Sequence, residues 1–236
     1  MNRHLVLYYG RQGSTIVYNH ISKTYCDPEF KFLDSGFSTT EIHKDSHLVF
    51  YDSIMKYNQK HNNDWAFKYH LLAGAQTTQN ENEWDLTGSR IFFNNLGVTN
   101  LHVCFRTDII DTICSYMIAD RDGSWVVTSG EIREHKPRFY DVDYIKRIVS
   151  NYKKGYYLHN AYVNTFYKKI NMKFYQYDKL KDIFDINNDR YGMKKQLSKE
   201  QKISLIENYE DVEQAVHESG LSDMIINPKT GVIQGK

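Results

Sequence analysis

The sequence predicts an α/β domain in which a central, mainly parallel sheet is flanked by helices. Short apolar runs alternate along the chain with longer segments whose apolar residues recur at helical spacing. Polar, asparagine-rich residues precede two of these runs, which is typical of loops that lead into strands. Strands that alternate with helices indicate βαβ units, whose ligands bind outside the carboxyl ends of the strands. We therefore expect residues with chemical roles at those ends.

The individual elements follow from the same patterns. Four apolar runs are predicted strands, at residues 5–9, 65–70, 101–105 and 173–177. Apolar stripes predict a helix that begins at Ser14, a second at 108–119 and one long helix or two over 140–169. Ser198 and Gln201 fit a capping box, and the spacing after them predicts a single helix that ends near Gly220. The polar segment 182–195 is the predicted connector.

The composition is that of one ordinary globular domain. Of the 236 residues, 41% are hydrophobic and 25% are charged, so disorder is not expected. We expect residues 1–236 to form a single domain, in which the C-terminal helical part, about 183–236, has no assigned role. The formal net charge is +1, which argues against a nucleic-acid partner because duplex binding needs a broad basic surface.

The cysteines and the hydropathy indicate the cellular compartment of the protein. Cys26, Cys104 and Cys114 are odd in number and lack metal-ligand spacing, so we expect free thiols, a reducing compartment and no resident metal. No stretch reaches the roughly 20 apolar residues of a membrane span, and the first apolar run is too short for a signal peptide. We therefore expect a cytoplasmic protein without a membrane span, of open oligomeric state.

The first candidate site is the turn between the first predicted strand and the helix that follows it. Its residues are Gly10, Arg11, Gln12, Gly13, Ser14 and Thr15. At such a turn, backbone N–H groups and the helix dipole attract anions, and glycine lets the backbone approach a phosphate. The turn lacks the Gly-Lys-Ser/Thr triplet of a Walker A motif, which argues against a nucleoside triphosphatase. The alternative is a tight turn without a ligand.

The second candidate site combines Arg106, which follows the third predicted strand, with Ser115 in the next helix. An arginine at a strand end offers bidentate contacts to phosphate oxygens, and a serine hydroxyl adds a directed hydrogen bond. The two residues together can bracket one phosphate. The alternatives are an ion-paired arginine and a helix serine that bonds to its own backbone.

In this order, the two motifs resemble those of the sulfotransferase superfamily, most closely its trehalose-type bacterial branch. That branch reads Arg-Ser-Gly-Ser-Thr in its phosphosulfate loop, where this chain has Arg11 through Thr15. Its second site is an arginine after a strand with a serine nine residues later, as at Arg106 and Ser115. The segment 175–180 is similar to the late strand of the family, so the likeness extends over roughly residues 5–181.

The resemblance implies a P-loop-like sulfotransferase fold and a sulfotransferase that uses 3′-phosphoadenosine-5′-phosphosulfate (PAPS). Its acceptor would be a hydroxyl of a carbohydrate or another small molecule, and its product adenosine 3′,5′-bisphosphate. Residues Arg11, Gln12, Gly13, Ser14, Thr15, Arg106 and Ser115 would bind the cofactor. Arg106 and Ser115 would hold the 3′-phosphate. The adenine-binding residues stay unassigned, because the glycine-rich segment of animal cytosolic members is absent.

Catalysis would proceed by in-line transfer, with Arg11 stabilising the charge that grows on the leaving nucleotide. Two residues compete for the role of general base. Glu29 is similar to the acidic residue after the first helix in the trehalose-type branch, whereas Lys68 and His70 resemble the lysine and histidine of cytosolic members. A histidine titrates near pH 6.5 and needs little tuning, whereas a glutamate benefits from partial burial. Both candidates stay open, as do Glu41 and His43.

Two other functions fit the same residues. A P-loop nucleotide or small-molecule kinase could use the turn at 10–15 for a triphosphate, although the Walker lysine is missing. A non-catalytic binding module could keep the nucleotide pocket without turnover.

Overall fold

The computed structural model describes residues 3–25, 65–70, 94–95, 97–123, 135–166, 169–184 and 197–234. Its centre is a sheet of four parallel strands in the order β2-β1-β3-β4. The strands are β1 (Arg3–Tyr8), β2 (Trp65–His70), β3 (Asn100–Phe105) and β4 (Asn171–Gln176). In register, Tyr8 lies beside His70 and Phe105 lies beside Gln176. The carboxyl ends of all four strands therefore meet at one edge of the sheet.

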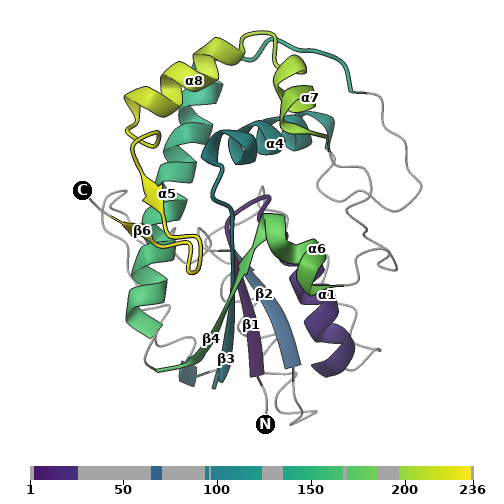
Figure 1. Ribbon diagram of the computed structural model, residues 1–236, viewed down its shortest axis with the longest axis vertical. Helices are drawn as coiled ribbons and strands as arrows, with labels where there is room; N and C mark the ends of the chain where they lie inside the picture. Colours follow the sequence, from purple (N-terminus) through teal and green to yellow (C-terminus); the bar gives the residue numbers. More distant parts are fainter. Residues whose placement is uncertain are drawn as a thin grey trace.

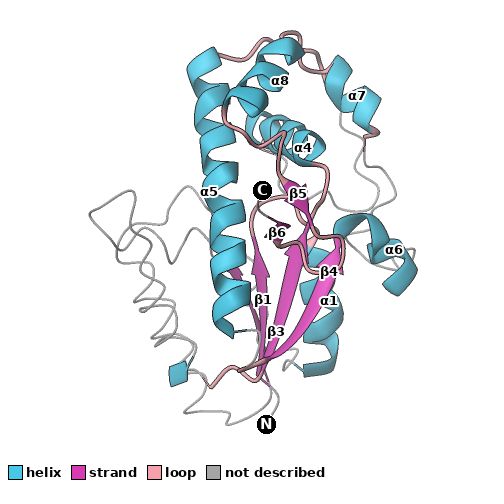
Figure 2. Cartoon of the chain, turned by 60° about the vertical axis from the view of Figure 1, so that its left-hand side comes forward, coloured by secondary structure: helices cyan, strands magenta, loops and turns pink. Residues whose placement is uncertain are grey.

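Helices cover both faces of the sheet and its carboxyl edge (Figure 1, Figure 2). Helix α1 (Ser14–Tyr25) packs against β1 and β2 on one face, and α5 (Val142–Phe166) runs along the other. Beyond the strand ends, α7 (Lys199–Ser204) and α8 (Tyr209–Glu218) pack on α4 (Ile109–Asp122). The remaining elements are η3 (Tyr177–Lys179), α6 (Leu180–Ile183) and a hairpin of β5 (Ile225–Ile226) and β6 (Ile233–Gln234).

The side chains of β1 alternate between two apolar clusters. Leu5 and Leu7 belong to the cluster that includes the buried face of α5, and Val6 belongs to the one that includes α1. All three are at most 1% exposed. A parallel strand that is buried on both faces reads as a continuous apolar run, which is why its position could be predicted. Burial of each such side chain contributes about 1.5–3 kcal/mol.

The predicted strands and the first three predicted helices are confirmed, with ends that differ by a few residues. The capping box is confirmed as well. The Ser198 hydroxyl accepts from the backbone N–H of Gln201, and the Gln201 side chain accepts from the N–H of Ser198. The prediction of a single C-terminal helix is wrong, because α7 ends at Ser204 and α8 begins only at Tyr209.

The break between α7 and α8 is made by pairing with the segment that precedes α5. The Leu205 carbonyl accepts from Arg138 N at 3.1 Å, and Glu207 N donates to the Arg138 carbonyl at 2.9 Å. The Asn208 side chain then bonds both backbone groups of Tyr140, at 3.0 and 2.9 Å. Asn208 and Tyr140 lie 68 residues apart in the sequence, so local spacing could not reveal this contact.

Three other predictions concern the connector, the cysteines and the absence of a membrane span, and the described residues cover each of them in part. Of the predicted connector 182–195, residues 182–184 are described and end α6 with a buried Phe184, while the rest lies outside the described residues. Cys104 and Cys114 are free and buried, and Cys26 lies outside the described residues. None of the described helices has both the length and the apolar character that a membrane crossing requires.

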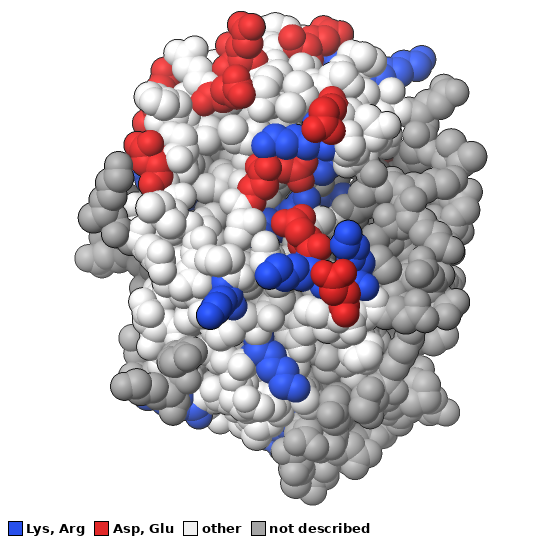
Figure 3. Space-filling model, in the orientation of Figure 1, with Lys and Arg blue, Asp and Glu red and all other residues white. Residues whose placement is uncertain are grey.

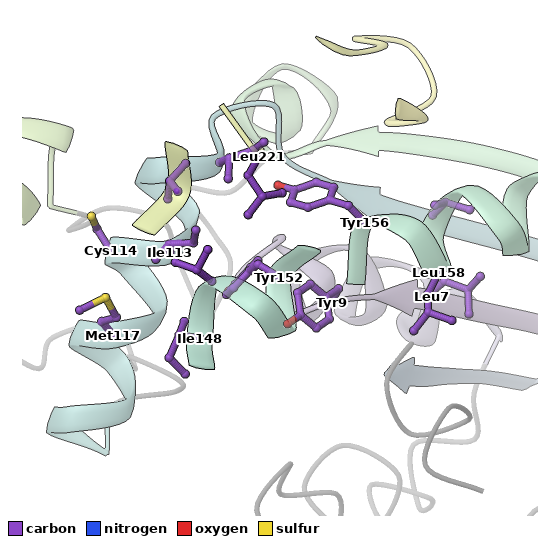
Figure 4. Packing of buried hydrophobic residues seen from close by; sticks show 14 of the residues in the cluster. Leu7, Tyr9, Ile113, Cys114, Met117, Ile148, Tyr152, Tyr156, Leu158 and Leu221 are labelled. Carbon is purple, nitrogen blue, oxygen red and sulfur yellow. The ribbon is translucent and has the colours of Figure 1, made fainter. Parts of the chain in front are cut away.

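Helix α5 approaches the end of β1 very closely at Gly155. A Cβ atom at this position would lie 2.4 Å from Cδ1 of Tyr9, whose side chain is buried. Figure 4 shows Tyr9 beside Tyr152, and their rings meet edge to face with 4.7 Å between centroids. Burial raises the pKa of both phenols well above its usual value, so both stay neutral. Glycine at 155 therefore sets the distance between α5 and the strand that leads into the turn at 10–15.

We expect Gly155→Ala to destabilise the protein by about 1–3 kcal/mol, although alanine is the better helix former. The added methyl group would overlap the Tyr9 ring, which cannot move without displacing Tyr152. Urea denaturation measures the change. Asn164→Ala, at an exposed position of the same helix, is the matched control and should be neutral or slightly stabilising. A Gly155→Ala variant as stable as the parent would contradict the close packing.

Candidate functional site

The candidate site lies where the sheet changes direction. The chain runs from β1 to β2 on one side, and it then returns to place β3 on the other side of β1. The segments that follow β1 and β3 therefore diverge at the carboxyl edge, and ligands of open α/β sheets bind in the crevice at such a point. The turn at 10–15 follows β1, and Arg106 follows β3. Both sequence motifs thus meet at this switch point.

The turn at 10–15 has a backbone that ordinary residues rarely adopt. Arg11 has a φ of 59° and Gly13 a φ of 76°. Gly13 is also crowded, since a Cβ atom there would lie 2.4 Å from Cδ1 of Leu180. The Gln12 side chain turns back and accepts a 2.7 Å hydrogen bond from Tyr9 N. A left-handed Arg11 costs about 1–2 kcal/mol, so contacts around the turn must hold it in place.

Those contacts reach the carbonyl groups of the turn. The Tyr152 hydroxyl donates to the Gly10 carbonyl at 3.4 Å, and Arg106 Nη1 donates to the Arg11 carbonyl at 3.3 Å. In a planar trans peptide the carbonyl and the N–H point in opposite directions. The N–H groups of Arg11 and Gln12 therefore point away from Tyr152 and Arg106. The first turn of α1, which starts at Ser14, adds N–H groups without intrahelical partners, so this side of the turn suits an anion.

The Arg11 side chain links the two sequence motifs. Its Nε donates a 3.2 Å hydrogen bond to Oγ of Ser115 on α4, 104 residues away. Burial lowers the pKa of the Arg11 guanidinium, although an arginine remains charged at any physiological pH. A partly buried cation of this kind is stabilised by an anion that replaces its lost water. Arg11 thus contacts both Ser115 and Arg106, and the three residues form one contiguous group.

Arg106 is buried in an ion-paired environment. It is 3% exposed, and its Nη2 lies 2.5 Å from Oδ2 of Asp111. The other oxygen of Asp111, Oδ1, lies 2.7 Å from Nζ of Lys202 on α7. The Arg106 guanidinium stacks on the Tyr177 ring, 3.8 Å from its centroid. Its Nε is buried and has no hydrogen-bond partner among the described residues.

Among the described residues, one buried carboxylate serves two buried cations. Arg106 and Lys202 bring two positive charges, while Asp111 brings the single carboxylate that both contact. The adjacent Asp108 and Lys199 form a neutral pair of their own at 2.7 Å. Buried cations in excess of their counter-ions are costly, and an anion relieves that cost. The electrostatics therefore favour a negatively charged ligand.

Another cation lies near the first turn of α1. Nζ of Lys68, on β2, lies 3.4 Å from Oγ1 of Thr15 and within 6 Å of the ring centroids of Tyr8 and Tyr18. Figure 3 shows how charged side chains lie on one face of the molecule. On the face it draws, basic and acidic side chains mix in a band toward α6, and acidic ones gather over α8.

Among the four candidate bases, His70 lies within the described residues. His70 is the last residue of β2, beside Tyr8 in register, so its backbone lies at the same edge as the turn. Glu29, Glu41 and His43 lie outside the described residues. The choice between Glu29 and His70 stays a prediction.

Three residues of the site were missed in the sequence. Tyr177 supports Arg106, and Asp111 and Lys202 complete its ion pairs. For Asp111 the sequence contained only a weak indication of a role, because acidic residues are common in the first turn of a helix and Asp108 already caps this helix. For Lys202 the sequence contained no indication, because no local pattern relates it to Asp111, which lies 91 positions earlier.

Comparison of the chain with protein-family models, curated proteins and solved structures found no match. Within the described residues, no three His, Cys, Asp or Glu side chains gather closely enough to hold a metal ion. The functional interpretation therefore depends on the motifs and on the geometry of the switch point.

We expect Asp111→Asn to destabilise the protein by about 3–5 kcal/mol, because it leaves two buried cations without a counter-ion. The matched control is Asp108→Asn, which removes a carboxylate from the same helix end. Asparagine still caps the helix, and the pair with Lys199 is about 40% exposed, so about 0–1 kcal/mol is expected. Chemical denaturation of both variants measures the difference. Equal losses would contradict a buried Asp111.

Proposed function

We propose that the chain is a PAPS-dependent sulfotransferase that transfers a sulfuryl group to a hydroxyl of a carbohydrate or another small molecule. The observation that carries the proposal is the convergence of Arg11, Ser115 and Arg106. The motif resemblance selected these residues, and Arg11 lies 104 residues from Ser115 and 95 residues from Arg106 in the sequence. A chance likeness of short motifs would not require Arg11 to touch both of the other two. Their position at the switch point of a parallel sheet supports the same conclusion.

The nucleotide would be held by both halves of the group. The phosphosulfate would lie against the N–H groups of the turn and the start of α1, with Lys68 and Arg11 supplying positive charge. The 3′-phosphate would lie toward Ser115, and Arg11 would exchange its hydrogen bond to Ser115 for one to the ligand. Arg106 already serves Asp111 and the Arg11 carbonyl, so its direct contribution would come through the unpartnered Nε.

The reaction would be an in-line displacement at sulfur. The acceptor oxygen forms a bond to sulfur while the bond from sulfur to the bridging oxygen breaks, and adenosine 3′,5′-bisphosphate leaves. Arg11 stabilises the negative charge that develops on that bridging oxygen. The acceptor proton passes to a base, for which His70 and Glu29 are the candidates. The position of the His70 backbone at the carboxyl edge supports the histidine.

We expect adenosine 3′,5′-bisphosphate to bind and to raise the melting temperature far more than ATP with magnesium does. At 100 times its Kd, a ligand stabilises the folded state by about 2.7 kcal/mol, which differential scanning fluorimetry detects. Arg11→Ala should weaken binding at least tenfold, since a charge-assisted contact is lost. Arg147→Ala, exposed on α5, is the control. Equal stabilisation by ATP would favour the kinase, and no binding of either nucleotide would overturn the proposal.

We expect the alanine variant of the true base to lose about 10²-fold or more in turnover while its affinity for the bisphosphate stays near the parent value. Labelled PAPS with a panel of sugar and phenol acceptors provides the assay for His70→Ala and Glu29→Ala. A His70 base would make the rate rise through a pKa near 6.5, whereas a glutamate would usually titrate lower. If both variants kept full activity, neither residue would be the base.

A further inference from the structure

An unbroken series of contacts joins α7 to the turn at 10–15. Nζ of Lys202 lies 2.7 Å from Oδ1 of Asp111 on α4. Oδ2 of the same carboxylate lies 2.5 Å from Nη2 of Arg106, and Nη1 of Arg106 donates to the Arg11 carbonyl at 3.3 Å. Lys202, Asp111 and Arg106 are all buried. The series therefore crosses the interior of the protein, away from solvent screening.

We propose that Lys202 and Asp111 are positioning residues, which hold Arg106 so that it fixes the left-handed conformation of Arg11. The short helix α7 would thereby set how well the turn binds an anion, without touching the anion itself. The identity of that anion rests on the proposed function, whereas the positioning role does not.

The role of Lys202 follows from the geometry of arginine and carboxylate. A carboxylate with both oxygens available tends to accept two parallel hydrogen bonds from one guanidinium. Lys202 occupies Oδ1 of Asp111, which leaves Oδ2 for Nη2 of Arg106. Nη1 is then available for the Arg11 carbonyl. Without Lys202, Asp111 could turn to accept both nitrogens of Arg106, and Nη1 would leave Arg11.

The turn depends on that hydrogen bond because its conformation is costly. Arg11 has a φ of 59°, which is unfavourable for a residue with a side chain. Such a conformation persists only where the surroundings hold it. Release of the carbonyl would let Arg11 relax to negative φ, which would rotate the peptide that carries the Gln12 N–H. The Gln12 side chain, which accepts from Tyr9 N, would move with it.

The structure offers a matched control on the same helix. Lys199 also comes from α7 and also contacts an aspartate of α4 at 2.7 Å, but its pair with Asp108 is about 40% exposed. Asp108 caps α4 and does not contact Arg106 in the described hydrogen bonds and ion pairs. A change at Lys199 therefore removes a cation from the same helix without breaking an ion pair of the series.

The test is amide hydrogen exchange of the ligand-free protein, followed by NMR. The Tyr9 N–H reports on the turn because its acceptor is Gln12, and the Val103 N–H in β3, a central strand paired on both sides, reports on global stability. In Lys202→Met we expect Tyr9 to exchange about tenfold faster, because the turn would open more readily, with Val103 unchanged. Lys202→Arg should restore the parent rate, and Lys199→Met should not alter it.

A second comparison separates positioning from a general loss of stability. When Lys202→Met is added to Arg106→Ala, Tyr9 exchange should not rise further, because Lys202 would act through Arg106. Arg106→Lys serves the same purpose if the alanine variant does not fold. The inference would be overturned if Lys202→Met raised the Tyr9 exchange rate by the same factor in the parent and in the Arg106→Ala variant. It would also be overturned if Lys202→Met left the Tyr9 rate unchanged.

Affinity for adenosine 3′,5′-bisphosphate connects the inference to the proposed function. Calorimetry should show a loss of about tenfold in Lys202→Met and none in Lys199→Met. If the parent protein does not bind the bisphosphate, the proposed sulfotransferase function fails, and the exchange rates still decide the positioning role.

Discussion

A parallel sheet whose two faces are both covered by helices can offer its backbone to a ligand at the ends of its strands. In this protein α1 and α5 cover the faces, so the carboxyl edge carries the polar groups that the core excludes. The turn at 10–15 occupies that edge and adopts a conformation that costs free energy on its own. The tyrosines behind the turn and Arg106 beside it make the conformation stable.

Asp111 has a central position in this arrangement because it is one carboxylate between two buried cations. A buried ion pair gains little stability over an apolar pair of the same shape, yet the loss of one partner is expensive. The pair is thus better understood as a means of fixing geometry. It orients the Arg106 guanidinium between Tyr177 and the Arg11 carbonyl, and its single charge balances only one of the two buried cations that it contacts. The same residues therefore organise the loop and favour an anion.

Most of the fold and part of the site could be predicted from local sequence patterns. Buried parallel strands and amphipathic helices repeat over a few residues, so β1 and α4 could be located from spacing alone. Arg11, Arg106 and Ser115 could be grouped because a motif relates them. Asn208 and Lys202 could not be interpreted, since their partners are Tyr140 and Asp111, far away in the sequence. The break between α7 and α8 and the buried ion pairs are tertiary effects that outweigh local spacing.

The hydrogen bond between Tyr152 and Gly10 spans 142 residues, and β1 pairs with β3 across almost a hundred. Contacts so distant along the chain are slow to form, because a large loop must close before it gains any stabilising contact. During synthesis, residues 3–25 leave the ribosome long before α5 or α7 exists. The turn and its apolar strand must then wait in a state without their final partners, in which exposed strand edges can associate with other chains. We therefore expect assembly of the candidate site to be a late event in folding.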